Sequence, residues 1–292
     1  MRVNPDLRSG MIDALQRVTA SESIVLRQLS SGKKIQSPSD DPAGMAALIQ
    51  VQANDSSTQQ YLSTIKAIRS QMQSADSSLN SVSIAIERAL TLGVRGATGT
   101  MTDADREAVA TEIDGVTDQL LELANSSQQG TYLFSGTATT TKPFAQSGNN
   151  VVYQGSASSN EIAVGEGYTI TNNVPGISVF GDDTAGLFGS VKKLSTALRT
   201  HGDVSGAIDQ LQAARENISS ARVVYGNSLN QIDSAETLMN GRHLQLTQQE
   251  TDIAGADLAD AATRLVSSQT SRNALLAAIA KTDQSSLFDY LR

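Results

Sequence analysis

Apolar residues recur at alternating four- and three-residue steps along most of this chain. In residues 11–29 such steps place one series on a single helical face, with Glu22 as its polar interruption: Met11, Leu15, Val18, Val25 and Leu29. This spacing is typical of the narrow seam of a coiled coil rather than of the broad face of a globular helix. We therefore predict a seam-forming helix near the N-terminus.

A second, much longer helix is predicted over about residues 43–93. The chain has no proline between Pro42 and Pro143 and no glycine between Gly44 and Gly93. Such a helix would be about 75 Å long, whereas a compact globule of this chain length would be about 50 Å across. The pattern therefore predicts an elongated rod of long antiparallel, coiled-coil-like helices.

The loop between these two helices carries most of the turn signals in the first hundred residues. Gly32 follows the seam series, where a left-handed helix end favours glycine. Asp40 and Asp41 precede Pro42, which suits an acidic N-cap followed by proline at the first helical position. We predict a capped helix–loop–helix connection.

A third helix is expected after residue 101, capped by Thr102 or Asp103 and ended by Gly130. The chain then changes character, because glycine, proline and aromatic residues become frequent over 132–186. Segments rich in β-formers at 149–154, 161–164 and 168–170 predict strands separated by turns. We expect a small inserted β-rich module with a core of its own.

Helical spacing returns at Leu187 and continues, with a break at Gly202, to the end of the chain. The layout is therefore mainly α, with helices on both sides of a β-rich insertion. We predict that the N- and C-terminal helices pair, and that the second helix pairs with the long one starting near 204. The last helix carries its own apolar series: Leu258, Leu265, Leu276, Ile279, Leu287, Phe288 and Leu291.

The terminal apolar series admit two interpretations. Exposed stripes of this kind usually mark contacts with another chain, which makes both terminal series candidate subunit-interface residues. The alternative is an antiparallel coiled coil within one chain. The pattern by itself leaves both open.

Composition narrows the possible functions. A net charge of −8 and a pI near 4.8 argue against nucleic acid, because no basic stripe is present to neutralise phosphates. The chain has no cysteine, hence no disulfide or thiolate chemistry. No stretch is apolar enough to cross a bilayer, and the N-terminus lacks a Sec-type signal pattern. We expect no membrane insertion, and export, if it occurs, by another route.

The chemically suggestive residues do not converge on an active site. The two histidines, His201 and His243, are isolated from other candidate ligands. Asp103 and Asp105 fit the role of cap and dipole partners of the third helix better than that of a cation site. We predict no catalytic, cofactor-binding or metal-binding residues, and hence no enzyme.

Several motifs resemble those of a known family. Residues 29–32 (Leu-Ser-Ser-Gly) and 37–44 (Ser-Pro-Ser-Asp-Asp-Pro-Ala-Gly) are similar to the N-terminal signature of bacterial flagellins and their junction relatives. Residues 130–137 (Gly-Thr-Tyr-Leu-Phe-Ser-Gly-Thr) and 286–291 (Ser-Leu-Phe-Asp-Tyr-Leu) resemble the hook–filament junction branch. Flagellins usually have alanine where Pro42 stands. The resemblance covers roughly 1–145 and 187–292.

The resemblance implies three domains. Residues 1–42 with 255–292 would form a terminal-helix polymerisation domain. Residues 43–131 with 187–254 would form a helical rod, and 132–186 an outer β-rich module.

The resemblance also implies function and partners. The chain would be a structural adaptor of the extracellular bacterial flagellum, exported by the type III apparatus. It would join another hook-associated protein to flagellin, in a ring of its own copies. A cytosolic export chaperone would bind about 255–292. The alternative is a flagellin-type filament subunit.

Overall fold

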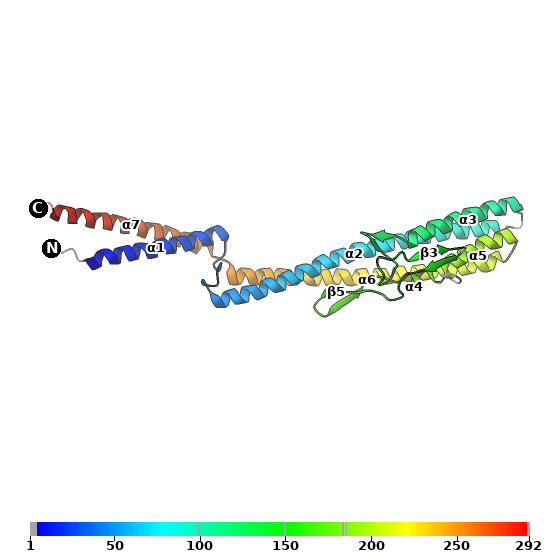
Figure 1. Cartoon of the computed structure of the whole chain (residues 1–292), viewed down its shortest axis with the longest axis horizontal. Coiled ribbons are helices and arrows are strands. Elements are labelled where there is room, and N and C mark those ends of the chain that lie inside the picture. Colours follow the sequence, from blue (N-terminus) through cyan, green and yellow to red (C-terminus); the bar gives the residue numbers. More distant parts are fainter. Residues whose placement is uncertain (1–4, 99, 149, 183, 185, 291–292) are drawn as a thin grey trace. The chain divides into compact units, whose positions relative to one another are not determined.

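The computed structural model describes residues 5–98, 100–148, 150–182, 184 and 186–290, with the side chains of 5–8 and 282–290 excepted. The chain is mainly α with a small β-rich insertion, which confirms the predicted fold class (Figure 1). The helices are α1 (Pro5–Ser31), α2 (Pro42–Gly96), α3 (Asp103–Ala124), α4 (Gly176–Phe180), α5 (Leu187–Thr200), α6 (Val204–Ala254) and α7 (Leu258–Tyr290).

The strands form three separate antiparallel pairs. They are β1 (Ser127–Gln128) with β2 (Thr131–Tyr132), β3 (Phe144–Ser147) with β4 (Asn150–Tyr153), and β5 (Glu161–Gly165) with β6 (Tyr168–Thr171). The last three strands match predicted segments. The first three strands and the short helix α4 were not predicted. β1, β2 and α4 are too brief to show a period, and β3 contains only one β-forming residue, Phe144.

The chain divides into two compact units. The first unit consists of two segments, the residues up to Ser57 and the residues from His243 onward. The second unit is Thr58–Arg242. In the first unit α1 packs along α7, as predicted for the terminal helices. In the second unit α2 pairs with α6, and the Arg222 Nε donates to Asp76 Oδ1 across the pair at 2.9 Å. The predicted helix pairing is confirmed.

The core of the second unit follows a seven-residue repeat on both long helices. Side chains at this spacing are almost completely buried on α2 and on α6: Ile65, Met72, Leu79 and Ile86, and Leu211, Ile218, Tyr225 and Ile232. A strict seven-residue repeat keeps a narrow seam facing the partner helix along its whole length. The second unit is therefore held by an extended seam instead of a spherical core.

The β-rich segment does not have a core of its own, contrary to expectation. Phe134 and Phe144 each pack edge-on against Phe180, with ring centroids 5.2 and 5.3 Å apart. These rings belong to the same buried cluster as Val191 and Leu194 of α5. Two-stranded hairpins cannot bury enough apolar surface to stand alone, so they pack on the helices.

The third helix ends at Ala124 and not at Gly130 as predicted. Asn125 ends it: its backbone N–H donates to the Leu121 and Glu122 carbonyl oxygens at 3.1 and 3.2 Å. Its side chain accepts from the Phe144 N–H at 2.9 Å and donates to the Phe144 carbonyl at 3.0 Å. The Asn125 side chain thus couples the helix end to β3, while Gly130 turns the β1–β2 hairpin with φ of 80°.

Tyr225 links α6 to the segment that precedes α4. The side chain is 2% exposed, and its hydroxyl oxygen accepts from the Val174 N–H at 3.1 Å. Burial disfavours the phenolate and raises the pKa of Tyr225 from 10.0 to about 12. The native state therefore keeps this proton over a pH range in which the unfolded chain loses it.

We predict that the second unit loses stability as pH rises from 10 towards 12, and that Tyr225→Phe weakens this dependence. The same substitution removes the acceptor of the partly buried Val174 N–H, which costs about 1 kcal/mol at neutral pH. Urea unfolding followed by circular dichroism at several pH values measures both effects. Tyr168→Phe, at a 43% exposed position, serves as the control. Equal pH dependence in Tyr225→Phe and the parent chain would contradict the assignment.

Candidate functional site

The α1–α7 pair brings most of the predicted interface residues together in the first unit. Val25 is buried, and the other members of the α1 series are partly buried: Met11, Leu15, Val18 and Leu29. On α7, Leu265 and Ile279 are partly buried, whereas Leu258 and Leu276 are 52% and 47% exposed. The seam between the two helices is therefore only partly closed.

The far end of α7 holds the remaining predicted interface residues. Leu287 and Phe288 lie in the helix, but their side chains are outside the described part of the chain, and Leu291 lies outside the described residues altogether. The assignment of the whole set to a subunit interface stays a prediction.

A second set of apolar side chains on the terminal helices is exposed and was missed by the seam pattern. It comprises Ile12, Ile24 and Leu26 on α1, exposed by 42–47%, and Val266 on α7, exposed by 63%. These positions lie off the alternating four- and three-residue grid, so a search for a single seam does not select them. Ile24 and Leu26 are two residues apart and therefore lie on different sides of α1, so these residues do not form one continuous patch on the helix.

The loop between α1 and α2 is capped at both ends. Gly32 adopts φ of 67°, and its N–H donates to the Gln28 carbonyl at 2.8 Å, which ends α1. Asp41 Oδ1 accepts from the Gly44 N–H at 2.9 Å, so Asp41 is the N-cap of α2, whose first residue is Pro42.

Asp40 supports the loop itself and does not cap a helix. Its Oδ2 accepts from the backbone N–H groups of Gln36 and Ser37, at 3.0 and 2.9 Å. These donors favour the carboxylate and hold the pKa of Asp40 below its ordinary value. The two neighbouring acids thus have different roles.

The loop is also joined to the connection between α6 and α7 by main-chain hydrogen bonds. Lys34 N–H donates to the Ala254 carbonyl at 2.7 Å, and Ala256 N–H donates to the Gly32 carbonyl at 2.9 Å. We call residues 32–34 and 254–256 together the connector bridge. It fixes the end of α1 beside the start of α7, and no sequence signal indicated it because the partners are distant in the chain.

Side chains reinforce the connector bridge. Lys33 Nζ lies 3.0 Å from Glu250 Oε1, and Gln52 Nε2 donates to the same oxygen at 3.1 Å. The hydrogen bond from Lys33 is the main reason that the pKa of Glu250 is lowered. Nearby, His243 Nδ1 lies 2.5 Å from Asp55 Oδ1, which gives this histidine a structural partner. These contacts hold the start of α2 against the end of α6.

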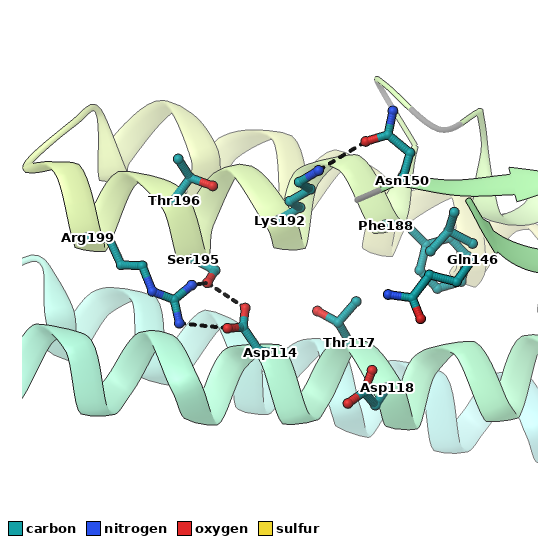
Figure 2. Close-up of a pocket in the computed structure, with 11 residues that line it drawn as sticks. Asp114, Thr117, Asp118, Gln146, Asn150, Phe188, Lys192, Ser195, Thr196 and Arg199 are labelled. Carbon is teal, nitrogen blue, oxygen red and sulfur yellow. Dashed lines mark hydrogen bonds and ion pairs between the residues drawn. The ribbon is translucent and has the colours of Figure 1, made fainter. Parts of the chain in front are cut away.

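The second unit contains a small cleft between α3, α5 and the β3–β4 hairpin, with a volume near 240 Å³ (Figure 2). Its polar groups bond to each other: Ser195 Oγ donates to Asp114 Oδ1 at 2.6 Å, and Arg199 Nη2 donates to Asp114 Oδ2 at 2.7 Å. Lys192 Nζ donates to Asn150 Oδ1 at the hairpin, at 3.0 Å. This arrangement ties α5 to α3 and to the hairpin.

Within the described residues, no three His, Asp or Glu side chains lie close enough together to hold a metal ion. His201 instead lies 3.0 Å from Asp103, and Asp105 forms a capping box with Thr102 at the start of α3. None of the helices, as far as they are described, has an apolar stretch long enough to cross a membrane.

Gly44 permits the close packing of the loop on α2. A Cβ at this position would overlap the Asp41 carboxylate and would lie 2.6 Å from Ile35 Cδ1, and Ile35 is 4% exposed. The absence of a side chain at Gly44 is therefore needed for both the cap and the buried Ile35.

We predict that Gly44→Ala destabilises the start of α2 by about 1–3 kcal/mol, because the loop must shift. Gly10→Ala is the matched control, since no atom lies within 4 Å of a Cβ there and alanine favours a helix by up to about 1 kcal/mol over glycine. Hydrogen exchange of the amides in the first turns of α1 and α2 measures both changes. Unaltered protection in Gly44→Ala would show that the loop can repack freely.

Comparison with known proteins connects this architecture to the flagellum. The bacterial flagellin N-terminal helical region matches residues 9–139. Flagellar hook-associated protein 3 of Escherichia coli K12 is 29% identical over 286 residues, covering 89% of this chain and 90% of that protein. A flagellin of Listeria innocua is 24% identical over 234 residues, covering 80% and 78% of the two chains.

The fold also agrees with that of a solved structure. Flagellar hook-associated protein 3 from Legionella pneumophila superposes with a TM-score of 0.65 at 14% identity, over 70% of this chain and 98% of that one. At this identity the likeness concerns the fold alone. Sequence and fold together confirm the resemblance of this chain to the flagellin superfamily and, within it, to flagellar hook-associated protein 3.

Proposed function

We propose that this chain is a non-enzymatic structural adaptor that joins another hook-associated protein to the flagellin filament. The observation that carries the proposal is the match to hook-associated protein 3 of Escherichia coli along nearly the whole of both chains. The flagellin of Listeria innocua matches a smaller share of the chain, 80%, at a lower identity of 24%. A junction subunit has to resemble flagellin enough to contact it and differ enough not to continue the filament.

Assembly through the terminal helices is supported by their surface. Leu258 and Leu276 on the seam, and Val266 off it, leave large apolar area exposed on α7 alone. Burying an exposed leucine against another chain contributes about 1.5–3 kcal/mol. In the proposed ring, these side chains contact neighbouring copies of the chain and the subunits of adjoining layers.

The three-domain division remains part of the proposal. The boundary near residue 255 lies in the connector bridge, where Lys34 and Ala254 are hydrogen-bonded, and the boundary near residue 42 is the start of α2. The two compact units divide elsewhere, at Ser57 and His243. The terminal helices outside this point would polymerise, the long helices inside it would form the rod, and residues 132–186 would form the outer module.

The proposed location is the extracellular flagellum, reached by type III export. A chain without cysteine needs no oxidative folding after export. Before export, a cytosolic chaperone would bind residues 255–292 and cover the apolar side chains of α7.

A flagellin-type filament subunit is the second candidate. It is favoured by the Listeria flagellin match, which covers 80% of this chain. The two candidates differ in self-assembly: purified flagellin-type subunits would extend into long filaments unaided, whereas junction subunits would stop at short assemblies. Electron microscopy of the purified full-length chain separates them, and long filaments would overturn the junction proposal.

We predict that deletion of residues 255–292 abolishes filament attachment and leaves the second unit folded. The deletion removes α7 but none of Thr58–Arg242. Circular dichroism of the purified variant should still show a cooperative unfolding transition. In a bacterial strain lacking its own copy of the chain, the full-length chain should restore attached filaments, while the deletion variant should leave bare hooks and shed flagellin. Normal filaments with the deletion variant would refute the proposal.

A further inference from the structure

A buried charge interrupts the apolar seam between the terminal helices. Glu22 occupies a seam position of α1, and its side chain is only 9% exposed. Burying a carboxylate is costly unless it is paired and hydrogen-bonded. The partner is Arg272 of α7, whose Nη1 lies 2.9 Å from Glu22 Oε2 and 3.2 Å from Oε1. The pair therefore crosses the seam from one terminal helix to the other.

The ion pair defines one register of the two antiparallel helices. The two helices are antiparallel, so residue numbers rise along α1 where they fall along α7. An ion pair between Glu22 and Arg272 therefore limits how far the two helices can slide past each other. In the register that places Glu22 opposite Arg272, Leu15 would lie opposite Ile279 and Leu29 opposite Leu265. All four of these side chains are partly buried, as expected of seam positions.

The apolar residues by themselves do not select this register. Leu15 and Leu29 lie seven residues on either side of Glu22, and Leu265 and Ile279 lie seven residues on either side of Arg272. A slip of seven residues, about 10 Å along the axis, would again bring seam positions opposite each other. It would, however, move Glu22 towards Leu265 or Ile279 and away from Arg272, leaving the buried carboxylate without its partner.

The connector bridge fixes only one end of the α1–α7 helix pair. It holds Gly32 beside Ala256, whereas Glu22 lies ten residues, or about 15 Å, further along α1. Beyond Glu22 the seam consists of partly buried side chains such as Leu15 and Val18. A second fixed point is needed there if the outer halves of α1 and α7 are to stay aligned.

We propose that Glu22 and Arg272 are the residues that select the register of the terminal helices, at some cost in stability. A single polar contact in an otherwise apolar seam is well suited to this role. For its consequence in assembly this inference rests on the proposed function, because the register decides which exposed side chains of α1 and α7 form one surface. The register itself is measured without any assembly.

The test uses cysteine pairs, since the chain has none of its own. Leu15→Cys with Ile279→Cys reports the seam beyond the ion pair, and Leu29→Cys with Leu265→Cys reports the seam beside the connector bridge. Each pair is oxidised in the dilute, purified full-length chain, and the intramolecular disulfide is quantified by gel mobility. Both disulfides should form in the chain that keeps Glu22 and Arg272.

Charge variants then separate register selection from general packing. Glu22→Arg alone and Arg272→Glu alone should lower the yield of the outer disulfide by about fivefold or more, because two like charges face each other. The double exchange, Glu22→Arg with Arg272→Glu, should restore it. Asp13→Arg and Arg264→Glu are the matched controls: Asp13 is exposed, and Arg264 pairs with Asp260 within α7. Both controls should leave the yield unchanged.

These measurements test register selection by Glu22 and Arg272 independently of the role of the chain in the flagellum. An outer disulfide that persists in the single variants, or fails to return in the double exchange, would overturn register selection by this pair. Absence of the outer disulfide in the parent chain would overturn the register itself. Filament attachment is scored separately: a register that behaves as expected in a chain that attaches no filament would refute the proposed function alone.

Discussion

The structure depends on burying narrow apolar stripes on helices that are too long to fold back on themselves. α2 contains 55 residues and α6 contains 51, and each presents side chains such as Met72 and Ile218 at seven-residue spacing. Such a stripe can be covered only by another helix running along it. The first half of the chain therefore needs the second half as its partner. Few aromatic residues are needed, because a narrow seam between two helices can be filled by smaller side chains.

An ion pair crosses each of these two seams and limits the register of its helices. Asp76 is bonded to Arg222 in the second unit, and Glu22 to Arg272 in the first. The surroundings differ, however. The Asp76 pair lies among almost fully buried heptad positions, whereas the seam around Glu22 is partly open. An ion pair therefore adds little to the register of the second unit, which its buried heptad positions already specify. It adds much to the register of the first unit, whose seam is partly open.

The elements with strong local signals could be predicted from the sequence. Gly32, Asp41 and Pro42 identify the loop and the start of α2 because their turn and cap preferences are local. The heptad series identified the helices and their partners. The end of α3 was placed too late because Asn125 stops it through contacts with β3, a tertiary effect with no local signature. The hairpins were assigned a separate core because their aromatic content does not reveal that α5 supplies the other wall.

The helices that form the candidate site could be predicted from the sequence, but the residues exposed on their surface could not. The seam grid found Leu15 and Leu265, but not the exposed Ile24 and Val266, which lie off it. It also treated Glu22 as an interruption, because a sequence pattern cannot show that a seam charge has a partner. The connector bridge escaped notice for the same reason: main-chain hydrogen bonds carry no residue preference.

The connector bridge has a consequence for the order of folding. Lys33 and Glu250 are separated by 217 positions, and Glu22 and Arg272 by 250, in a chain of 292 residues. Contacts of such long sequence separation form only after a large loop has closed, and they form slowly. The first unit therefore cannot close until almost the entire chain is available in one place. A chain still being delivered end-first, whether from the ribosome or through a narrow channel, keeps its leading segment unpaired until its last helix arrives.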